Sequence, residues 1–250
     1  MNLDLAKLNR IQQVNLSTYQ IHSQTFPQFK CINQGKKVYI IASGPSASRV
    51  IYNKKITKDP DGIYIGVNRS FQIGNGCFDM NYIFIQDYSG KTKEYIDELD
   101  EYRKDECQKF YGLTAEWRCP SKFVDKVIPE SHAIKANALR YRTDWTDVEG
   151  FTNEFAYNLS AQPLGCFGSI VFPALQFALW TYPKEIYLIG CDCSEEGYAY
   201  KKNEKNFLPV EQIINAYKKF KIFAYRYYPD VKIYSINPVG LKGLFQDIIL

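Results

Sequence analysis

The sequence predicts one α/β domain with a mostly parallel, doubly wound sheet of the Rossmann-like class. Two observations predict this class. Short β-rich runs alternate with helix-prone segments along the chain, and several of the runs end in polar residues. The 250 residues, 46% of them hydrophobic, are enough to bury one large core. We therefore expect residues 1–250 to form a single domain.

The first half of the chain opens with apolar residues at helical spacing and continues as alternating strands and helices. The expected elements are a helix at 3–20, a strand at 38–42, a helical turn at 47–52, strands at 63–67 and 82–85, and a helix-prone segment at 91–110. Polar residues follow each of these three strands, so the strands should present them at one edge of the sheet.

The second half begins with a poorly patterned stretch, from about residue 112 to 165, which proline and glycine interrupt repeatedly. We interpret it as a lid or acceptor-side subregion. Regular patterning then returns. The expected elements are an apolar helix at 168–180, a buried strand at 184–189, a polar loop at 194–206, a helix at 209–228 and a last strand at 231–236.

Composition excludes several classes of function. A net charge of +4 is too small an excess to indicate nucleic-acid binding, although it suits an anionic small ligand. Seven scattered cysteines without a CxxC pair indicate reduced thiols and no zinc site. The sequence has no leader-like start and no apolar run of membrane-spanning length, so we expect a cytoplasmic protein.

The turn Ser43-Gly44-Pro45-Ser46, after the first strand, is the sharpest signal in the sequence. Glycine lets backbone approach a ligand closely, and the start of a helix directs free N–H groups at an anion. Proline in the first helical turn removes no needed donor. The turn therefore predicts a phosphate site, although the same four residues also form ordinary turns.

Three other strand ends carry candidate site residues. Asn68 and Asp87 end the strands that follow the first one, and Asp192 follows Gly190-Cys191 at the end of a later strand. Each side chain could contact a ligand at the carboxyl edge of the sheet, or it could cap its own loop. Asp87 and Asp192 are also candidate catalytic carboxylates.

Tyr198 and Tyr200, in the polar loop after Asp192, are candidate donors to a phosphate. The two histidines, His22 and His132, are expected on the surface or in loops, and His132 is in addition a candidate general base. No Asp-x-Asp, HExxH or Walker pattern is present, so the sequence predicts no bound metal.

The ordered set of motifs resembles the bacterial sialyltransferases of glycosyltransferase family 42 and the broader MptE-like group, named for a 6-hydroxymethylpterin pyrophosphokinase. The resemblance rests on Val38-Tyr39-Ile40-Ile41-Ala42 with its turn, on Gly66-Val67-Asn68, and on Gly168-Ser169 before the helix that leads into the strand ending at Asp192. It covers roughly residues 36–240, with 112–164 unaligned.

The resemblance implies a modified Rossmann-like domain of GT-A type that binds a CMP-activated acid sugar without a metal or other cofactor. It implies nucleotide contacts at the Ser43–Ser46 turn, Asn68, Gly168 and Ser169, and a phosphate contact from Tyr198 or Tyr200. Ser194 stands where the family has a second tyrosine. The family's histidine base and an arginine before Gly168 are both absent.

These departures leave the base open among Asp87, Glu195, Glu196 and His132. The leading hypothesis is an inverting glycosyltransferase that moves a sialic-acid-like sugar onto a glycan or lipid-linked acceptor of a bacterial surface, at the inner face of the membrane. The alternatives are a pyrophosphokinase that uses ATP and a divalent metal, and a non-catalytic nucleotide-binding subunit. Peripheral membrane contact and a homo-oligomer both remain open as expectations.

Overall fold

An eight-stranded sheet forms the centre of the molecule. The computed structural model describes residues 5–52, 56–74, 77–113, 127–144, 154–200 and 210–250. The strands run in the order β10-β9-β8-β1-β2-β3-β4-β5, and every neighbouring pair is parallel. Their bounds are β1 Lys37–Ile41, β2 Ile63–Val67, β3 Tyr82–Ile85, β4 Gln108–Gly112, β5 Leu139–Tyr141, β8 Glu185–Ile189, β9 Lys232–Ile236 and β10 Gln246–Ile248. A separate parallel pair joins β6 (Thr143–Asp144) to β7 (Leu164–Gly165).

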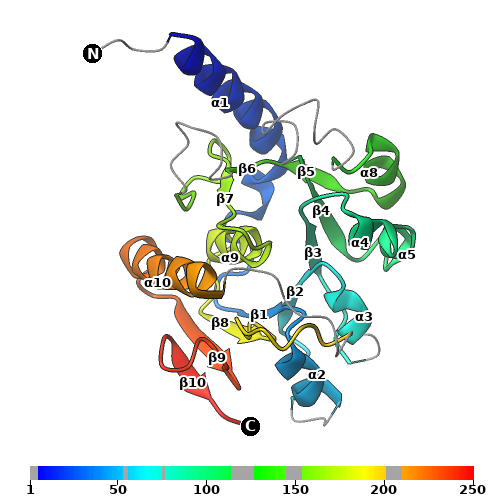
Figure 1. Cartoon of the computed structure of the whole chain (residues 1–250), viewed down its shortest axis with the longest axis vertical. Coiled ribbons are helices and arrows are strands. Elements are labelled where there is room, and N and C mark those ends of the chain that lie inside the picture. Colours follow the sequence, from blue (N-terminus) through cyan, green and yellow to red (C-terminus); the bar gives the residue numbers. More distant parts are fainter. Residues whose placement is uncertain (1–4, 53–55, 75–76, 114–126, 145–153, 201–209) are drawn as a thin grey trace.

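Helices cover both faces of the sheet (Figure 1). Their bounds are α1 Leu5–Thr25, the 3₁₀ turn η1 Pro27–Phe29, α2 Pro45–Tyr52, α3 Ser70–Gly74, α4 Gly90–Lys93, α5 Ile96–Glu101, α8 Glu130–Ala136, α9 Val171–Trp180 and α10 Val210–Tyr227. Alternate residues of β1 point into two cores: Val38 and Ile40 pack with α9 and α10, while Tyr39 and Ile41 pack with α2 and α3. A strand buried on both faces is apolar throughout, which explains the run that the sequence shows.

The chain reverses direction across the sheet next to β1. From β1 it proceeds outward through β2, β3 and β4 to β5, and it then returns to the opposite side of β1 with β8, β9 and β10. The carboxyl ends of β1 and β8 therefore border a topological switch point, the place where ligands bind in open α/β sheets. The predicted fold class is confirmed.

Several elements differ from the sequence prediction. The segment expected to be helix-prone at 91–110 contains α4 and α5 but ends in β4, whose second residue, Lys109, is fully buried. Part of the stretch 112–165 forms α8, β5, β6 and β7, all too short to produce a periodic pattern, whereas 114–126 and 145–153 lie outside the described residues. A further strand, β10, follows the strand expected to be last. Within the described residues, no helix combines the length and apolarity needed to cross a membrane.

His22 is a core residue rather than the surface residue that the sequence suggested. Its ring lies in α1 and is fully buried, with Nδ1 2.9 Å from the carbonyl oxygen of Leu159. Its Nε2 accepts a hydrogen bond of 2.8 Å from the backbone N–H of Arg142. These two bonds require a neutral ring with the proton on Nδ1. Burial lowers the pKa of His22 to about 4.

The depressed pKa of His22 predicts a loss of stability in mild acid. Below pH 6.5 the unfolded chain takes up a proton on His22, which the folded chain resists down to about pH 4. The free energy of unfolding should therefore fall by roughly 2 to 3 kcal/mol between pH 7.5 and pH 4.5 because of this one group. Urea unfolding at both pH values should show this loss greatly reduced in His22→Gln. The matched control is His132→Gln, which removes the chain's other histidine; an unchanged pH dependence in His22→Gln contradicts the assignment.

Candidate functional site

A cavity of about 580 Å³ lies at the carboxyl edge of the sheet, over the ends of β1, β2, β3 and β8. The start of α9, the inner side of α10 and the loop that follows β8 complete its walls. Nine of the residues that the sequence predicted as site residues line it: Ser43, Gly44, Asn68, Asp87, Gly168, Ser169, Asp192, Tyr198 and Tyr200. Segments far apart in sequence thus meet at the switch point.

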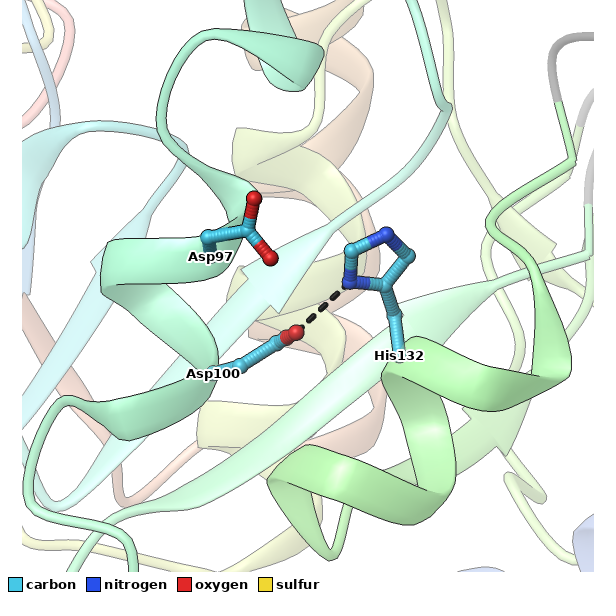
Figure 2. Close-up of side chains that lie close together, drawn as sticks. All are labelled: Asp97, Asp100 and His132. Atoms are coloured by element: carbon cyan, nitrogen blue, oxygen red, sulfur yellow. Dashed lines mark hydrogen bonds and ion pairs between the residues drawn. The ribbon is translucent and has the colours of Figure 1, made fainter.

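Three predicted residues do not line the cavity. Pro45 is the first residue of α2, and Ser46, the second, is buried beneath the turn. His132 lies in the first turn of α8, beside the buried carboxylate of Asp100 (Figure 2). Ser46 instead hydrogen-bonds to Asp192, and the ligand contact expected of Pro45 stays a prediction.

Position 44 requires a glycine because the turn after β1 and the turn after β8 cross at this point. Its N–H donates to the carbonyl oxygen of Gly190 at 2.9 Å. A Cβ at Gly44 would lie 2.4 Å from the same oxygen and 2.6 Å from Cγ of Asp192. The absence of a side chain lets β1 and β8 exit side by side, and it is this crossing, more than room for a phosphate, that requires glycine.

Asp192 caps helix α2 across the switch point. One oxygen accepts the backbone N–H of Ser46 at 2.7 Å, and the other accepts the Ser46 hydroxyl. Burial raises the pKa of the Asp192 carboxyl, although both bonds from Ser46 oppose the rise. The start of α2 is therefore occupied by a carboxylate of the protein itself, which corrects the expectation that it would be free for an anion.

The start of α9 offers an anion a different place at the cavity. Gly168, Ser169, Ile170 and Val171 all line the cavity, and α9 begins at Val171. The helix has no acidic residue in its first turn; the N-cap residue Ile170 has no side-chain acceptor, and the neighbouring Ser169 hydroxyl accepts the N–H of Val171 at 3.4 Å. Because the positive end of a helix dipole favours negative charge, this end suits a phosphate.

The turn also contributes a hydroxyl donor. Ser43 lines the cavity, and its Oγ is shielded from solvent. That oxygen hydrogen-bonds to no group among the described residues. The backbone carbonyl oxygen of Ser43 accepts the N–H of Ala199 at 2.8 Å. This hydrogen bond holds the loop after β8 over the end of β1.

The loop after β8 is held over the cavity by its two tyrosines. Their rings stack with centroids 5.2 Å apart. Lys91 Nζ lies 4.9 Å from the ring of Tyr198, and the guanidinium of Arg69 lies 5.2 Å from the ring of Tyr200. Such cation–π contacts stabilise the loop and place Lys91 and Arg69 at the rim, where Arg69 is also ion-paired with Glu94. The remainder of the loop, 201–206, lies outside the described residues.

The two neighbouring strand ends add polar groups to the wall. Asn68 takes a left-handed backbone conformation, with φ 50°, directly after β2. Gln86 and Asp87 follow β3, and the side-chain amide of Gln86 donates to Sγ of Cys166 at 3.0 Å. Among the described lining residues, the charged ones are Asp87 and Asp192.

Sequence reasoning missed several lining residues. Gln86 was detectable, because it ends the same strand as Asp87. Gln212, Ile213 and Tyr217 enter from α10, and nothing in a helical repeat tells which part of its inner face borders a cavity. Arg69 and Lys91 act at the rim through tyrosines that are distant in sequence.

Comparison with known proteins identifies a similar fold. No family model matches the chain, and neither does any curated protein. Among solved structures, the chain is similar to the MAf glycosyltransferase from Magnetospirillum magneticum AMB-1, with a TM-score of 0.53 and 11% sequence identity. The match covers 93% of this chain and 38% of that protein, so this chain spans well under half of its length. At this identity the likeness concerns the fold.

The cap of α2 yields a prediction about stability. Asp192→Ala removes both hydrogen bonds to Ser46 and should lower the free energy of unfolding by about 2 kcal/mol, whereas Ser46→Ala removes one and should cost about 1 kcal/mol. Because the two side chains share one interaction, the double variant should be about as stable as Asp192→Ala alone. Urea unfolding of the four proteins measures this. Full additivity of the two losses would show that the carboxylate does not act through Ser46.

Proposed function

We propose that this protein is a nucleotide-sugar-dependent glycosyltransferase whose donor binds in the cavity at the β1–β8 switch point. The observation that carries the proposal is the convergence of nine predicted site residues on one cavity in that position. Its volume of about 580 Å³ lies within the range of small-ligand sites. The similar fold of a protein described as a glycosyltransferase adds support.

The donor would lie with its phosphate against the start of α9. There the helix dipole and the turn at Gly168 and Ser169 meet the negative charge, and the Ser43 hydroxyl and the Tyr198 and Tyr200 phenols are further donors on the cavity wall. Lys91, over the ring of Tyr198, would lower the cost of bringing an anion to this rim, whereas the charge of Arg69, over the ring of Tyr200, is paired with Glu94. Asp87 and Asn68 face the remaining space, where sugar hydroxyls would be bound.

The finer proposal is a CMP-activated, sialic-acid-like donor that is used with inversion and without a metal. Its support is the motif resemblance together with the chemistry of the wall. Asp192 is committed to Ser46, so Asp87 is the remaining carboxylate among the described lining residues, and one carboxylate is a poor ligand set for Mg²⁺. A nucleoside monophosphate carries less charge than a diphosphate and needs a metal less.

The acceptor would be a glycan or a lipid-linked glycan of a bacterial surface. It would meet the enzyme in the cytoplasm or at the inner face of the membrane. Contact with the membrane surface and self-association of the chain belong to this proposal as well.

Nucleotide binding and donor turnover test the proposed function. Calorimetric titration with CMP, CDP and ATP should show the strongest binding for CMP, with affinity changed less than about twofold by Mg²⁺ or EDTA. Donor hydrolysis or transfer, followed by release of CMP, should survive EDTA, because the described residues of the wall offer no metal ligand set. ATP binding that depends on Mg²⁺ would instead favour the pyrophosphokinase alternative. Nucleotide binding without turnover of any donor would favour the non-catalytic one.

A further inference from the structure

A buried glutamine, Gln176, lies within α9 and uses its whole amide group inside the protein. The residue is 1% exposed. Its Oε1 accepts the backbone N–H of Ala156 at 2.8 Å and that of Gly165 at 3.0 Å. Its Nε2 donates to the carbonyl oxygens of Gly165 at 2.7 Å and Phe172 at 2.9 Å. An amide side chain has two acceptor sites and two donors, so these bonds fix Gln176 in one orientation.

Gly165 is held by this amide through both of its backbone polar groups. It ends β7, and the turn that leads into α9 follows it as residues 166–170. A Cβ at Gly165 would lie 2.3 Å from the carbonyl oxygen of Glu154, so two backbone segments pass close together here. A buried polar network that is fully satisfied is rigid. Gln176 therefore fixes the point from which the turn 166–170 starts.

The turn 166–170 has an uncommon backbone. Phe167 and Gly168 are both left-handed, with φ 48° and φ 81°. A bulky residue rarely takes this conformation, which persists only where neighbouring groups hold it. The N–H of Ser169 donates to the carbonyl oxygen of Cys166 at 2.8 Å and closes the turn, and Phe155 stacks on Phe167 with ring centroids 4.4 Å apart. The shape of the turn thus depends on contacts with the segments around it.

The turn leaves two backbone N–H groups without a partner at residues that line the cavity. Gly168, Ser169 and Ile170 are all lining residues. Within the described part of the chain, the N–H groups of Gly168 and Ile170 donate to no group. Successive backbone N–H groups in a turn form a concave site for an anion. A displacement of the turn would move these donors away from a bound phosphate.

A second glutamine in the preceding segment makes bonds of a similar kind without reaching the turn. Oε1 of Gln162 accepts the backbone N–H of Tyr157 at 3.1 Å and that of Asn158 at 3.0 Å. These three residues are not among those that line the cavity. Gln162 therefore serves as the comparison for a glutamine whose bonds stabilise a loop and nothing more.

We propose that Gln176 is a positioning residue for the donor phosphate, because it keeps the turn 166–170 in the shape that binds this group. The inference rests on the proposed function, which places the phosphate at the start of α9. Gln176 is not a lining residue, so it would touch neither the donor nor the acceptor. Its effect would pass through Gly165 to the N–H groups of Gly168 and Ile170. The binding of the nucleoside part of the donor should not depend on it.

The affinities for CMP and for cytidine, which lacks the phosphate, test this inference. Gln176→Met keeps the length of the side chain and removes its hydrogen bonds. In calorimetric titration it should bind CMP about 10-fold to 100-fold more weakly than the parent, the range for one hydrogen bond to a charged group. The affinity for cytidine, measured by competition with CMP, should change less than about twofold.

Gln176→Glu is a second variant that retains part of the network. It keeps the oxygen that accepts from Ala156 and Gly165, and it loses both donors of Nε2. It should also weaken CMP binding and spare cytidine, and it provides the test if circular dichroism shows that Gln176→Met does not fold. Gln162→Met is the matched control, and both of its affinities should stay within about twofold of the parent.

Hydrogen exchange without nucleotide measures the turn itself. The amide of Ser169 closes the turn and makes no bond to Gln176. Followed by NMR, this amide should exchange at least about 10-fold faster in the Gln176 variants than in the parent, and at the parent's rate in Gln162→Met.

Several outcomes overturn the inference and leave the proposed function intact. They are an unchanged CMP affinity in the folded Gln176 variants, equal losses for CMP and cytidine, a loss of the same size in Gln162→Met, and an unchanged exchange rate at Ser169. A parent protein that binds CMP no more tightly than cytidine overturns the inference as well. A parent protein that binds no nucleotide overturns the proposed function and this inference with it.

Discussion

The contact between Asp192 and Ser46 holds together the two turns on which the cavity depends. A single buried carboxylate, arriving from β8, satisfies the start of the helix that follows β1. With Gly44 donating to Gly190 beside it, this contact fixes how the chain leaves two adjacent strands at the switch point. Buried polar groups are costly unless they are paired, so this pairing holds the two turns in place at the edge of the cavity. It also determines which helix end remains for a ligand.

The choice of helix end that remains for a ligand decides the electrostatics of the site. The start of α2 faces a protein carboxylate, whereas the start of α9 faces the cavity without one. Positive side chains enter indirectly, since Arg69 and Lys91 contact the outer faces of the tyrosine rings that line the wall. A site of this kind suits an anion of low charge that is bound by hydroxyls, backbone and a helix dipole. The donor that we propose, with a single phosphate, is an anion of this kind.

The sequence predicted the strand ends well because parallel strands bring their carboxyl ends to one edge, whatever the loops do. Asn68, Asp87 and Asp192 lie at one cavity for that reason, and their roles as ligand contacts stay predictions. Contacts between distant residues were not predictable. The partner of Ser46 lies 146 residues away, and that of His132 lies 32 residues away in another helix.

Local pattern also failed where tertiary burial overrides it. The charged segment 91–110 was predicted to be helix-prone, yet it ends in β4, where the side chain of Lys109 is buried in the sheet. His22 looked like a surface residue because its two backbone partners, at Leu159 and Arg142, come from segments with little pattern of their own. Short elements such as β5 and β10, three residues each, are too brief for any periodicity to appear.

The central claim is that a nucleotide binds at the β1–β8 switch point with its phosphate at the start of α9. A crystal structure of the protein with CMP bound tests this claim most directly. We expect the phosphate within hydrogen-bond distance of the backbone at Gly168–Val171, while the Asp192 carboxylate stays on Ser46. A phosphate bound at the start of α2 with Asp192 displaced, or a nucleotide bound outside the cavity, would contradict the account.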